Sequence, residues 1–554
     1  MSKSQETVIS RDVMAPMRDG VRLATDVRLP PGDGPFPVVL ERNPYGKDGD
    51  DPDAQDPYTP RGYAYVTQDC RGTGVSEGAW EPFVNERADG LDTHEWILRQ
   101  PWCNGSICTT GGSYLGFTQW IVAPGAGDHH KAMFTTVPLT DWHDDCFYIG
   151  GAFALGLAMA WGAMMATPSA STPDTVDWET WDWETAYRHL PLSTWDDQTG
   201  AEIAHIREWL RHPDFDDYWA KADITRRLPE IDTPAVTVAG WYDVFANHAF
   251  RTVAGLRDLG RRDQHLIVGP WAHGVDVPED GRDYGPSAGP EVLNGIELAW
   301  FDHHANGAAR PDLAPYRIFV MGANEWRDEQ EWPLARTAFT PYYLSGQAGG
   351  GLSPEAPDAP GAPGSPGSDK PDTYDYDPHD PVPTHGGALL FDASIGSYDQ
   401  RDVEARDDVL VYTSAPLTEP LEVTGPVKVI LYAASDAPDT DWTAKLVDVY
   451  PDGRAFNLCD GVIRARYRVA GEPPSPIEPG RVYRYEIDCW VTSNVFLAGH
   501  SIRVDISSSN FPRVDRNLNT GHDFAADELA VARQTVFHDV ERPSHVLLPL
   551  IPTG

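Results

Sequence analysis

The chain has 554 residues, which is enough for two or three domains of ordinary size. Its 43 lysines and arginines stand against 84 aspartates and glutamates, so the formal charge is −41. An excess of acid this large excludes nucleic-acid binding through a basic face.

The composition also bears on location and on metal binding. The N-terminus is polar, without the apolar stretch of a signal peptide, and no run of about 18 apolar residues is present to span a membrane. The six cysteines are scattered, lack the paired spacing of a zinc site, and fit free thiols in a reducing compartment. We therefore expect a cytoplasmic protein without metal, cofactor or membrane contact. The sequence leaves open whether it forms a homo-oligomer.

Residues 1–140 have the pattern of an α/β core. An Asp-Gly pair at Asp19–Gly20 lies between two alternating runs and predicts a hairpin. The short apolar runs Phe36–Leu40 and Tyr63–Thr67 predict buried parallel strands, and Glu86–Arg99 has helical spacing. Strands that alternate with helices indicate a mostly parallel sheet covered by helices.

The strongest chemical signal in this core is the run Gly111–Gly116. The β-branched run Ser106–Thr110 before it predicts a strand, and the apolar run Phe117–Ala123 after it predicts a buried helix. A serine on a sharp strand-to-helix turn flanked by glycines is typical of the nucleophile of α/β-hydrolases, because its hydroxyl stands clear of the sheet. We therefore predict Ser113 as a nucleophile. The alternative is an ordinary serine in a glycine-rich turn.

A literal Gly-x-Ser-x-Gly match occurs earlier, at Gly74–Gly78. The residues that follow it include Gly78, Trp80 and Pro82, which predict a loop instead of the helix that a nucleophile turn needs. Ser76 is therefore predicted to have no catalytic role.

Residues 141–229 differ from the preceding core and are predicted to form an inserted helical cap. Tryptophans gather there, helix-like stretches replace strands, and the apolar run Phe147–Met165 is interpreted as a buried helical hairpin or a pocket wall. The core is predicted to resume over 230–345, with strands at Thr233–Gly240 and His265–Gly269.

The last third of the chain has a third pattern. Residues 346–384 are rich in Pro, Gly, Ser and Asp and predict a linker or a long surface loop. From 385 to 554, short strand-like runs recur between turn signals, which predicts an all-β sandwich.

A nucleophilic serine needs a base, and the base needs an acid to orient it. In α/β-hydrolases the chain order is nucleophile, acid, histidine, with the last two just after late core strands. Asp243 and His273 hold these positions, at the carboxyl ends of strands, where α/β sheets place ligands. We predict them as acid and base. The nearest alternatives are His248 and His265, of which His265 begins its strand at the opposite edge.

Acyl transfer also needs donors for the oxyanion. The backbone amide of Tyr114, directly after the nucleophile, is predicted as the first. The loop Arg42–Lys47 after an early strand has no glycine run to offer a second backbone donor. Tyr45, which Pro44 places, could supply its phenol. The alternative is a tyrosine on a surface loop.

At these motifs the chain resembles the cocaine esterase and X-prolyl dipeptidyl-peptidase family of serine hydrolases, which also includes α-amino acid ester hydrolases and glutaryl-cephalosporin acylases. The resemblance covers essentially the whole chain and rests on five motifs in order: Arg42–Tyr45, Asp69–Gly78, Gly111–Gly116, Gly240–Asp243 and Gly269–His273. It implies an α/β-hydrolase core with an inserted helical cap and a C-terminal all-β jelly-roll domain.

The resemblance also implies roles for single residues. It gives Ser113, Asp243 and His273 as the catalytic triad, and Tyr45 with the Tyr114 amide as the oxyanion hole. It also implies that the early Gly-x-Ser-x-Gly match lies in a structural loop.

By local match with cocaine esterase-like members, Phe147, Trp161 and Phe245 would line the acyl pocket; the alternative is packing within the cap. Amino-ester hydrolases bind a substrate ammonium with acids just after the catalytic aspartate, and the segment Val244–Asn247 has none. A carboxylate could still come from the cap, where the alternative is a solvated acidic run: Asp141, Asp144 and Asp145.

We therefore predict a serine hydrolase that cleaves acyl esters through an acyl-enzyme intermediate, with a preference for neutral acyl groups. One alternative is an acylase or X-prolyl dipeptidyl-peptidase that acts on an amide bond. Another is a carbohydrate-binding protein with a decayed hydrolase core, because jelly rolls often bind sugars. The expected partner is a small-molecule ester or amide substrate.

Overall fold

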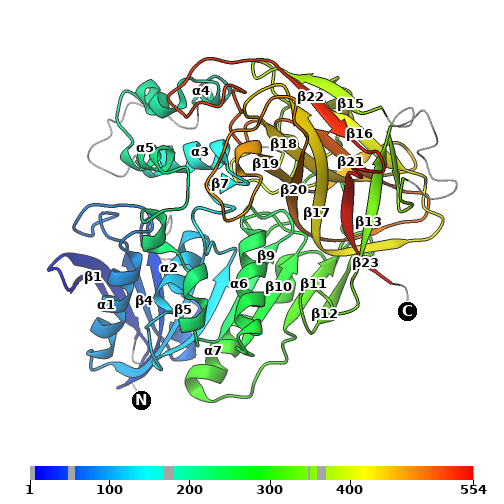
Figure 1. The fold of residues 1–554 in the computed structure, drawn as a ribbon. Coiled ribbons are helices and arrows are strands. Elements are labelled where there is room, and N and C mark those ends of the chain that lie inside the picture. The colour runs from blue at the N-terminus through cyan, green and yellow to red at the C-terminus, as the bar shows by residue number, and fades with distance from the viewer. Residues whose placement is uncertain are drawn as a thin grey trace.

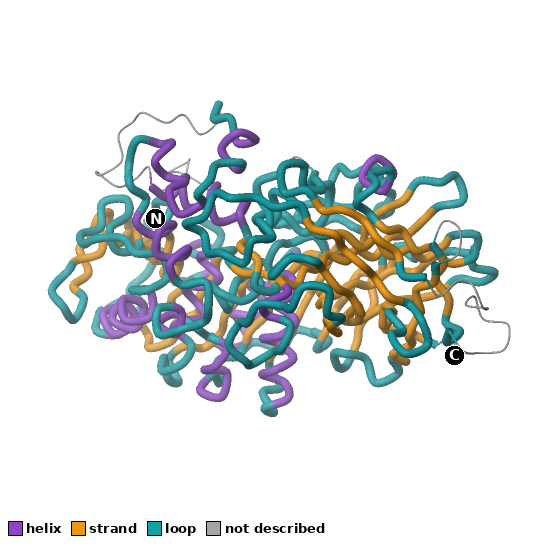
Figure 2. The backbone as a smooth tube through the Cα atoms, turned by 45° about the horizontal axis from the view of Figure 1, so that its top comes forward, coloured by secondary structure: helices purple, strands orange, loops and turns teal. Residues whose placement is uncertain are grey.

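The computed structural model describes residues 6–47, 56–166, 180–346, 350–357, 370–392 and 394–552. Figure 1 shows a core of helices and strands that holds the N-terminal half of the chain, with a β-rich domain beside it in yellow to red. In Figure 2 the strands dominate one side of the molecule and the helices the other.

The core is built on one ten-stranded sheet. Its strands follow the order β1-β2-β4-β3-β5-β6-β9-β10-β11-β12. All neighbours from β4 to β11 run parallel, and the edge pairs β1–β2, β2–β4 and β11–β12 run antiparallel. The bounds are β1 (Val8–Pro16), β2 (Arg22–Leu29), β3 (Phe36–Asn43), β4 (Ala64–Asp69), β5 (Cys103–Gly112), β6 (His130–Thr136), β9 (Ala235–Gly240), β10 (Gln264–Gly269), β11 (Tyr316–Val320) and β12 (Glu325–Glu329).

Helices cover both faces of this sheet, as the continuous apolar runs of its strands require. Helix α7 (Ile296–Asn306) packs Trp300 and Phe301 on one face. On the other face lie α1 (Glu86–Leu98), α2 (Tyr114–Val122) and α6 (Ala246–Asp258). Alternate residues of a strand point to opposite faces, so Val38 packs under α1 while Val39 packs toward α7.

The cap is inserted between β6 and β9, which are neighbours in the sheet. It contains the hairpin β7 (Tyr148–Ile149) and β8 (Ala152–Phe153), the helices α3 (Leu155–Ala166), α4 (Trp183–Tyr187) and α5 (Ala204–Arg211), and several short 3-10 turns. Residues 167–179 of the predicted cap lie outside the described residues.

The predicted helical hairpin over Phe147–Met165 was wrong in its first half. That half is a two-stranded β-hairpin whose turn consists of Gly150 and Gly151, both at positive φ. A Cβ on Gly150 would lie 1.9 Å from the Val462 carbonyl oxygen, so only glycine allows the hairpin to approach the β-domain this closely. The sequence showed apolar character but not this close approach.

The C-terminal domain is all β. Its described residues form the strands β13 (Ala338–Ser345), β14 (Gly351–Ser353), β15 (Asp372–Tyr376), β16 (Leu410–Ser414), β17 (Leu421–Ser435), β18 (Asp441–Val449), β19 (Ala455–Arg464), β20 (Tyr483–Phe496), β21 (Ser501–Ser507), β22 (Ala532–Phe537) and β23 (His545–Ile551). They follow the order β15-β22-β17-β23-β13-β14-β16-β21-β18-β19, with β20 on β17. Together they enclose a large apolar core that contains Trp442 and Tyr485, and the short helix α8 (Arg401–Glu404) lies outside it.

Two of the predicted boundaries differ from this arrangement. Strand β13, placed by the sequence in the core segment 230–345, pairs with β23 of the β-domain. The segment 346–384 is more than a linker, because β14 and β15 within it join the same sheet; its residues 358–369 lie outside the described residues. Both strands pair with partners far away in sequence, which local composition does not reveal.

Backbone hydrogen bonds and an ion pair join the core to the β-domain. The Met321 amide donates to the Ser493 carbonyl over 3.0 Å, and the Val495 amide donates back to Met321 over 2.8 Å. Arg327 on β12 forms a bidentate ion pair with Glu422 on β17, at 2.6 and 2.9 Å. Within the described parts of the chain, none of the helices has the length and hydropathy needed to cross a bilayer.

Candidate active site

Ser113 lies on the sharp turn between β5 and α2. Its backbone has φ 56° and ψ −121°, a conformation that residues with a side chain rarely adopt and that stores strain. The Ser113 amide donates to the Thr136 carbonyl over 2.9 Å, which fixes the turn to β6. The turn therefore has the geometry of the α/β-hydrolase nucleophile.

The flanking glycines are needed because the chain segments approach closely here. Gly111 has φ +126°, and a Cβ on it would lie 2.5 Å from the Leu115 Cβ. A Cβ on Gly116 would lie 2.9 Å from the Pro138 Cβ. Both distances are shorter than real Cβ contacts allow, so the glycines permit helix α2 to start directly after the strand.

Asp243 and His273 meet at the carboxyl ends of β9 and β10. The Nδ1 atom of His273 lies 2.7 Å from the Asp243 Oδ1 atom, and Asp243 is fully buried. This contact occupies Nδ1 and leaves Nε2 as the ring nitrogen for proton transfer. The His273 ring lies edge-on to Phe245, with ring centroids 5.4 Å apart.

The loops that carry these two residues interlock. The Trp241 amide donates to the Gly269 carbonyl over 2.9 Å, and the Tyr242 amide donates to the Trp271 carbonyl over 3.0 Å. A Cβ on Gly240 would lie 2.1 Å from that same Trp271 oxygen. The motifs Gly240–Asp243 and Gly269–His273 therefore hold each other in place. This contact also sets the positions of Asp243 and His273.

Tyr45 is held at the pocket by the residues just before it. The Asn43 Oδ1 atom accepts a hydrogen bond from the Tyr45 amide over 2.8 Å, an Asx turn around Pro44. Arg42 anchors the base of this turn, because its guanidinium forms a buried ion pair with Glu86 at 2.8 Å. The turn therefore has both a fixed shape and a fixed base.

The Tyr45 phenol accepts a hydrogen bond from the Trp161 indole over 3.1 Å. Although 47% of Tyr45 is exposed, its hydroxyl end lies against Trp161 and Ser113. Burial there raises the pKa of Tyr45 to about 12, and the hydrogen bonds with Trp161 and Ser113 oppose the shift. The phenol thus keeps its proton at neutral pH and can donate it.

Tyr114 is buried and lines the pocket at Ser113. Its hydroxyl accepts from the Phe83 amide over 2.7 Å and donates to Glu86 over 3.1 Å. Its backbone N–H begins helix α2, where the first N–H groups have no partner within the helix. This amide is therefore available to an anion beside Ser113.

A small pocket opens at Ser113. Phe147, Trp161 and Phe245, the three predicted wall residues, all line it together with Tyr45. Their side chains are also part of a larger buried cluster: Phe147 stacks on Trp209 with ring centroids 4.0 Å apart. Lining the pocket and packing the cap are therefore not exclusive alternatives for these residues.

The structure adds pocket residues that sequence reasoning missed. Phe83, from the loop before α1, stacks on both Tyr114 and Trp161, with ring centroids 4.8 and 5.5 Å away. Leu390 comes from the β-domain and lines the same pocket. Neither carries a local sequence signal, because each reaches the pocket only through the packing of distant segments.

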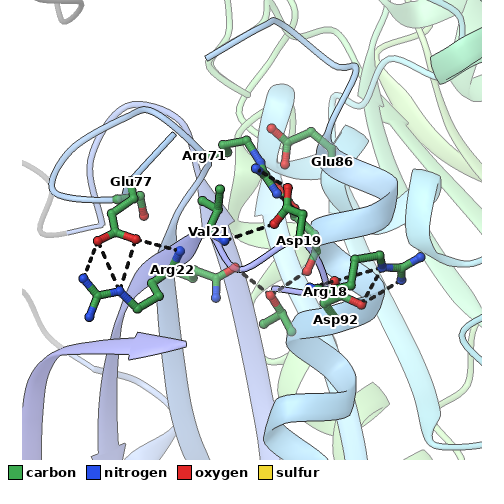
Figure 3. Close-up of polar contacts among 12 residues, drawn as sticks. Arg18, Asp19, Val21, Arg22, Arg71, Glu77, Glu86 and Asp92 are labelled. Atoms are coloured by element: carbon green, nitrogen blue, oxygen red, sulfur yellow. Dashed lines mark hydrogen bonds and ion pairs between the residues drawn. The ribbon is translucent and has the colours of Figure 1, made fainter. Parts of the chain in front are cut away.

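The early Gly-x-Ser-x-Gly loop has a structural role. The Ser76 hydroxyl accepts from the Ala24 amide over 2.8 Å and donates to the Asp69 carbonyl over 2.9 Å. Figure 3 shows how ion pairs tie this loop to the first hairpin: Arg71 binds Asp19, and Glu77 binds Arg22. The loop therefore fixes the edge of the core sheet.

The two alternative histidines occupy structural positions. His248 is buried, accepts the Thr140 amide at Nδ1 over 3.1 Å, and has its pKa lowered to about 4 by burial. His265 bonds the Ala314 carbonyl through Nδ1 over 2.8 Å and packs against Trp300. Neither lines the pocket at Ser113.

The acidic residues at the start of the cap are not a solvated run. Asp145 is buried and pairs with Arg251 at 2.5 Å, and it accepts from Asn247 over 2.9 Å. Asp141 is also buried, and burial raises its pKa to about 7. Of the three predicted acids only Asp144 is exposed, and none lines the pocket.

Comparison with known proteins supplies the family. Residues 19–275 match the family model of the X-Pro dipeptidyl-peptidase (S15 family), and residues 306–547 match the X-Pro dipeptidyl-peptidase C-terminal non-catalytic domain. The chain is 41% identical to the cocaine esterase of Rhodococcus sp. (strain MB1 Bresler), over 98% of each chain. It belongs to the X-Pro dipeptidyl-peptidase (S15) family of serine hydrolases.

Solved structures support the same fold for this S15 family member. An aminopeptidase from a marine sediment Thaumarchaeota archaeon is 26% identical, with a TM-score of 0.85 over 100% of this chain and 98% of that chain. An α-amino acid ester hydrolase is also 26% identical, with a TM-score of 0.85 over 99% and 97%. The predicted family, fold class and serine hydrolase chemistry are confirmed.

Proposed function

We propose that the protein is a carboxylesterase that cleaves acyl esters at Ser113. The observation that carries this proposal is a strained serine turn that opens into an apolar pocket beside a phenol donor. The extent of the likeness to the Rhodococcus cocaine esterase, 41% identity over nearly the whole chain, supports an ester as the substrate.

In the proposed reaction the Ser113 hydroxyl oxygen attacks the ester carbonyl while His273 Nε2 takes its proton. The Tyr114 amide and the Tyr45 phenol donate hydrogen bonds to the oxyanion. Collapse of this intermediate breaks the bond to the alcohol, which leaves with the proton from His273. Water then attacks the acyl-enzyme by the same route, and Asp243 stabilises the imidazolium in both steps.

A covalent serine probe tests the nucleophile directly. A fluorophosphonate should label the protein once, on the peptide that contains Ser113, and Ser113→Ala should abolish both labelling and ester hydrolysis. Ser76→Ala is the matched control, because Ser76 lies in the other glycine-flanked serine motif. Labelling that survives in Ser113→Ala would reject the assignment.

The acyl group is proposed to be neutral. The described residues that line the pocket are uncharged, and the segment after Asp243 begins with the buried apolar residues Val244 and Phe245. An ammonium group in such a pocket would lose its hydration without gaining a carboxylate partner. Phenylacetyl esters should therefore exceed phenylglycyl esters of the same alcohol in kcat/KM. A tenfold advantage for the phenylglycyl ester at low and high salt would reverse this assignment.

An acylase or dipeptidyl-peptidase activity is the second candidate, favoured by the family models and by the aminopeptidase of similar fold. The same triad chemistry would act on an amide. Parallel assays of p-nitrophenyl esters and aminoacyl anilides separate the two, and we expect turnover of the esters to dominate. A cytoplasmic location remains a prediction of the sequence, which leaves self-association open. The proposed partner is a small-molecule substrate.

A further inference from the structure

A second cavity adjoins the pocket at Ser113. The residues that line both spaces are Cys146, Leu157 and Leu390. Leu157 and Leu390 are half-buried. The first lies on α3 of the cap and the second on a loop of the β-domain, so the two spaces adjoin where these parts of the molecule meet.

The second cavity is mainly apolar. Its walls include Ile149, Ala154, Val244, Ala388 and Leu389. Two charged residues also border it, and both already have partners: Arg513 pairs with Asp460, and Asp392 accepts from the Ser394 hydroxyl over 2.6 Å. The cavity therefore offers mainly apolar surface to an occupant, and its two charged side chains are already bound by neighbouring residues.

The cap builds both spaces from one segment. Phe147 and Trp161 line the pocket at Ser113, and Ile149 and Ala154, which line the second cavity, lie between them in sequence. The acyl group of the substrate is the part proposed to lie against Phe147 and Trp161. A longer acyl group would therefore follow the same cap segment past Leu157 into the second cavity.

We propose that the second cavity takes the distal part of the acyl group, so that the substrates are esters of medium-chain or bulky apolar acids. This inference rests on the proposed esterase function. It adds the class of carboxylic acid from which the ester substrate is formed. It also assigns a specificity-determining role to Leu390 and Ala388 of the β-domain. The β-domain thereby contributes to substrate choice as well as to the fold.

The test is a series of p-nitrophenyl esters with straight acyl chains from two to ten carbons, assayed below the concentrations at which they form micelles. Each buried methylene should raise kcat/KM by up to about fourfold, since burial stabilises it by about 0.8 kcal/mol. The rise should begin once the chain passes Leu390 and should end when the second cavity is full. A profile that falls steadily beyond the acetyl ester would overturn the proposal.

Two substitutions test whether the gain in kcat/KM for longer acyl groups comes from the second cavity. Ala388→Leu adds volume at a residue that lines the second cavity and not the pocket at Ser113, so it should remove the gain for the longer esters relative to the acetyl ester. Ala308→Leu makes the same change at an exposed site on the core and should preserve the whole profile. Equal profiles for the two variants would overturn the proposal.

Leu390→Ala tests the same cavity by removing side-chain volume instead of adding it. It removes side-chain volume from the wall that the two spaces share and should extend the gain to acyl groups that are branched near the carbonyl. An unchanged preference for branched acyl groups would contradict the inference. Loss of the proposed function itself is distinguishable, because the acetyl ester would then not be hydrolysed and Ser113 would not be labelled.

Discussion

At the scale of single residues, the site combines groups whose protonation the surroundings control. Trp161 donates to the Tyr45 phenol, which leaves the phenol proton for another acceptor. The raised pKa of Tyr45 keeps that proton in place at neutral pH. A neutral donor that faces a developing oxyanion stabilises the transition state more than the ground state.

Tyr45→Phe removes this donor and preserves the ring. We expect kcat to fall by about 100- to 1,000-fold, with little change in KM, because the bond is made mainly in the transition state. Steady-state kinetics on one p-nitrophenyl ester measures both constants. Tyr343→Phe, on β13 of the β-domain, is the matched control. A kcat like that of the parent would place the second oxyanion donor elsewhere.

The proposed base His273 and the buried His248 lead to opposite predictions. His273→Ala should lower kcat by several orders of magnitude, as loss of a triad base does on other folds. His248→Asn should keep kcat, because its amide oxygen can accept the Thr140 N–H in place of Nδ1. His248→Ala should cost about 1–3 kcal/mol in free energy of unfolding, since it leaves that buried N–H without a partner. Full turnover in His273→Ala would identify a different base.

At the scale of secondary structure elements, the junction of β5 and α2 determines where the proposed nucleophile lies. The strand ends and the helix begins within one residue, and Ser113 has an unfavourable conformation there. Such a turn persists only where the surroundings hold it. The glycine before it, the bond to Thr136 and the packing of α2 provide that support.

Gly111→Ala should damage this junction more than an ordinary glycine substitution. The new Cβ meets Leu115 and also requires a positive φ, which costs about 1–2 kcal/mol for a residue with a side chain. Gly105→Ala is the matched control, because Gly105 lies on the same strand at φ +93° with no atom within 4 Å of the new Cβ.

Urea denaturation and kcat together test this prediction. We expect Gly105→Ala to lose only the cost of the backbone conformation and to keep its kcat. Gly111→Ala should lose more stability and also most of its kcat, because Ser113 moves with the turn. Equal losses in the two variants would mean that the contact with Leu115 is relieved without cost.

At the scale of the whole molecule, the active site lies where the core, cap and β-domain meet. Ser113 comes from the core, Trp161 from the cap and Leu390 from the β-domain. Arg251 on α6 binds Asp145 of the cap at 2.5 Å and Asp488 of the β-domain at 3.2 Å, so one side chain connects all three. The pocket is therefore a product of domain assembly.

The stability of the whole molecule should fall in mild acid through its buried histidines. Burial lowers the pKa of His130 to about 3, so the folded state keeps it neutral while the unfolded chain takes up a proton below about pH 6.5. The unfolded state then binds more protons, and the free energy of unfolding decreases as pH falls from 6.5 toward 3. At pH 5 this single residue costs about 2 kcal/mol.

His130→Gln removes the titration and keeps a polar group near Thr109, which His130 contacts at 3.0 Å. Between pH 7 and pH 5 the variant should lose about 2 kcal/mol less stability than the parent, as measured by urea denaturation at both values. His379→Gln, at an exposed histidine, should follow the parent. A parallel loss in His130→Gln and the parent would contradict the assignment.

The amino-acid sequence by itself determined the family, the fold class and the elements around Ser113, Asp243 and His273. These signals are local: a glycine turn between a strand and a helix, or a short motif that ends a buried strand, is written in consecutive residues. The meeting of Asp243 and His273 at 2.7 Å also follows from the sequence, since parallel neighbours bring their carboxyl ends to one edge.

The tertiary structure alone decided which distant segments complete the pocket. Phe83 and Leu390 carry no motif, and they reach Ser113 because loops from two domains pack there. Strand β13 joins the β-domain by pairing with β23, about two hundred residues further along the chain. Asp145 of the cap is buried where it contacts Arg251 and Asn247. Pairing and burial depend on contacts between residues far apart in the chain, which no local pattern specifies.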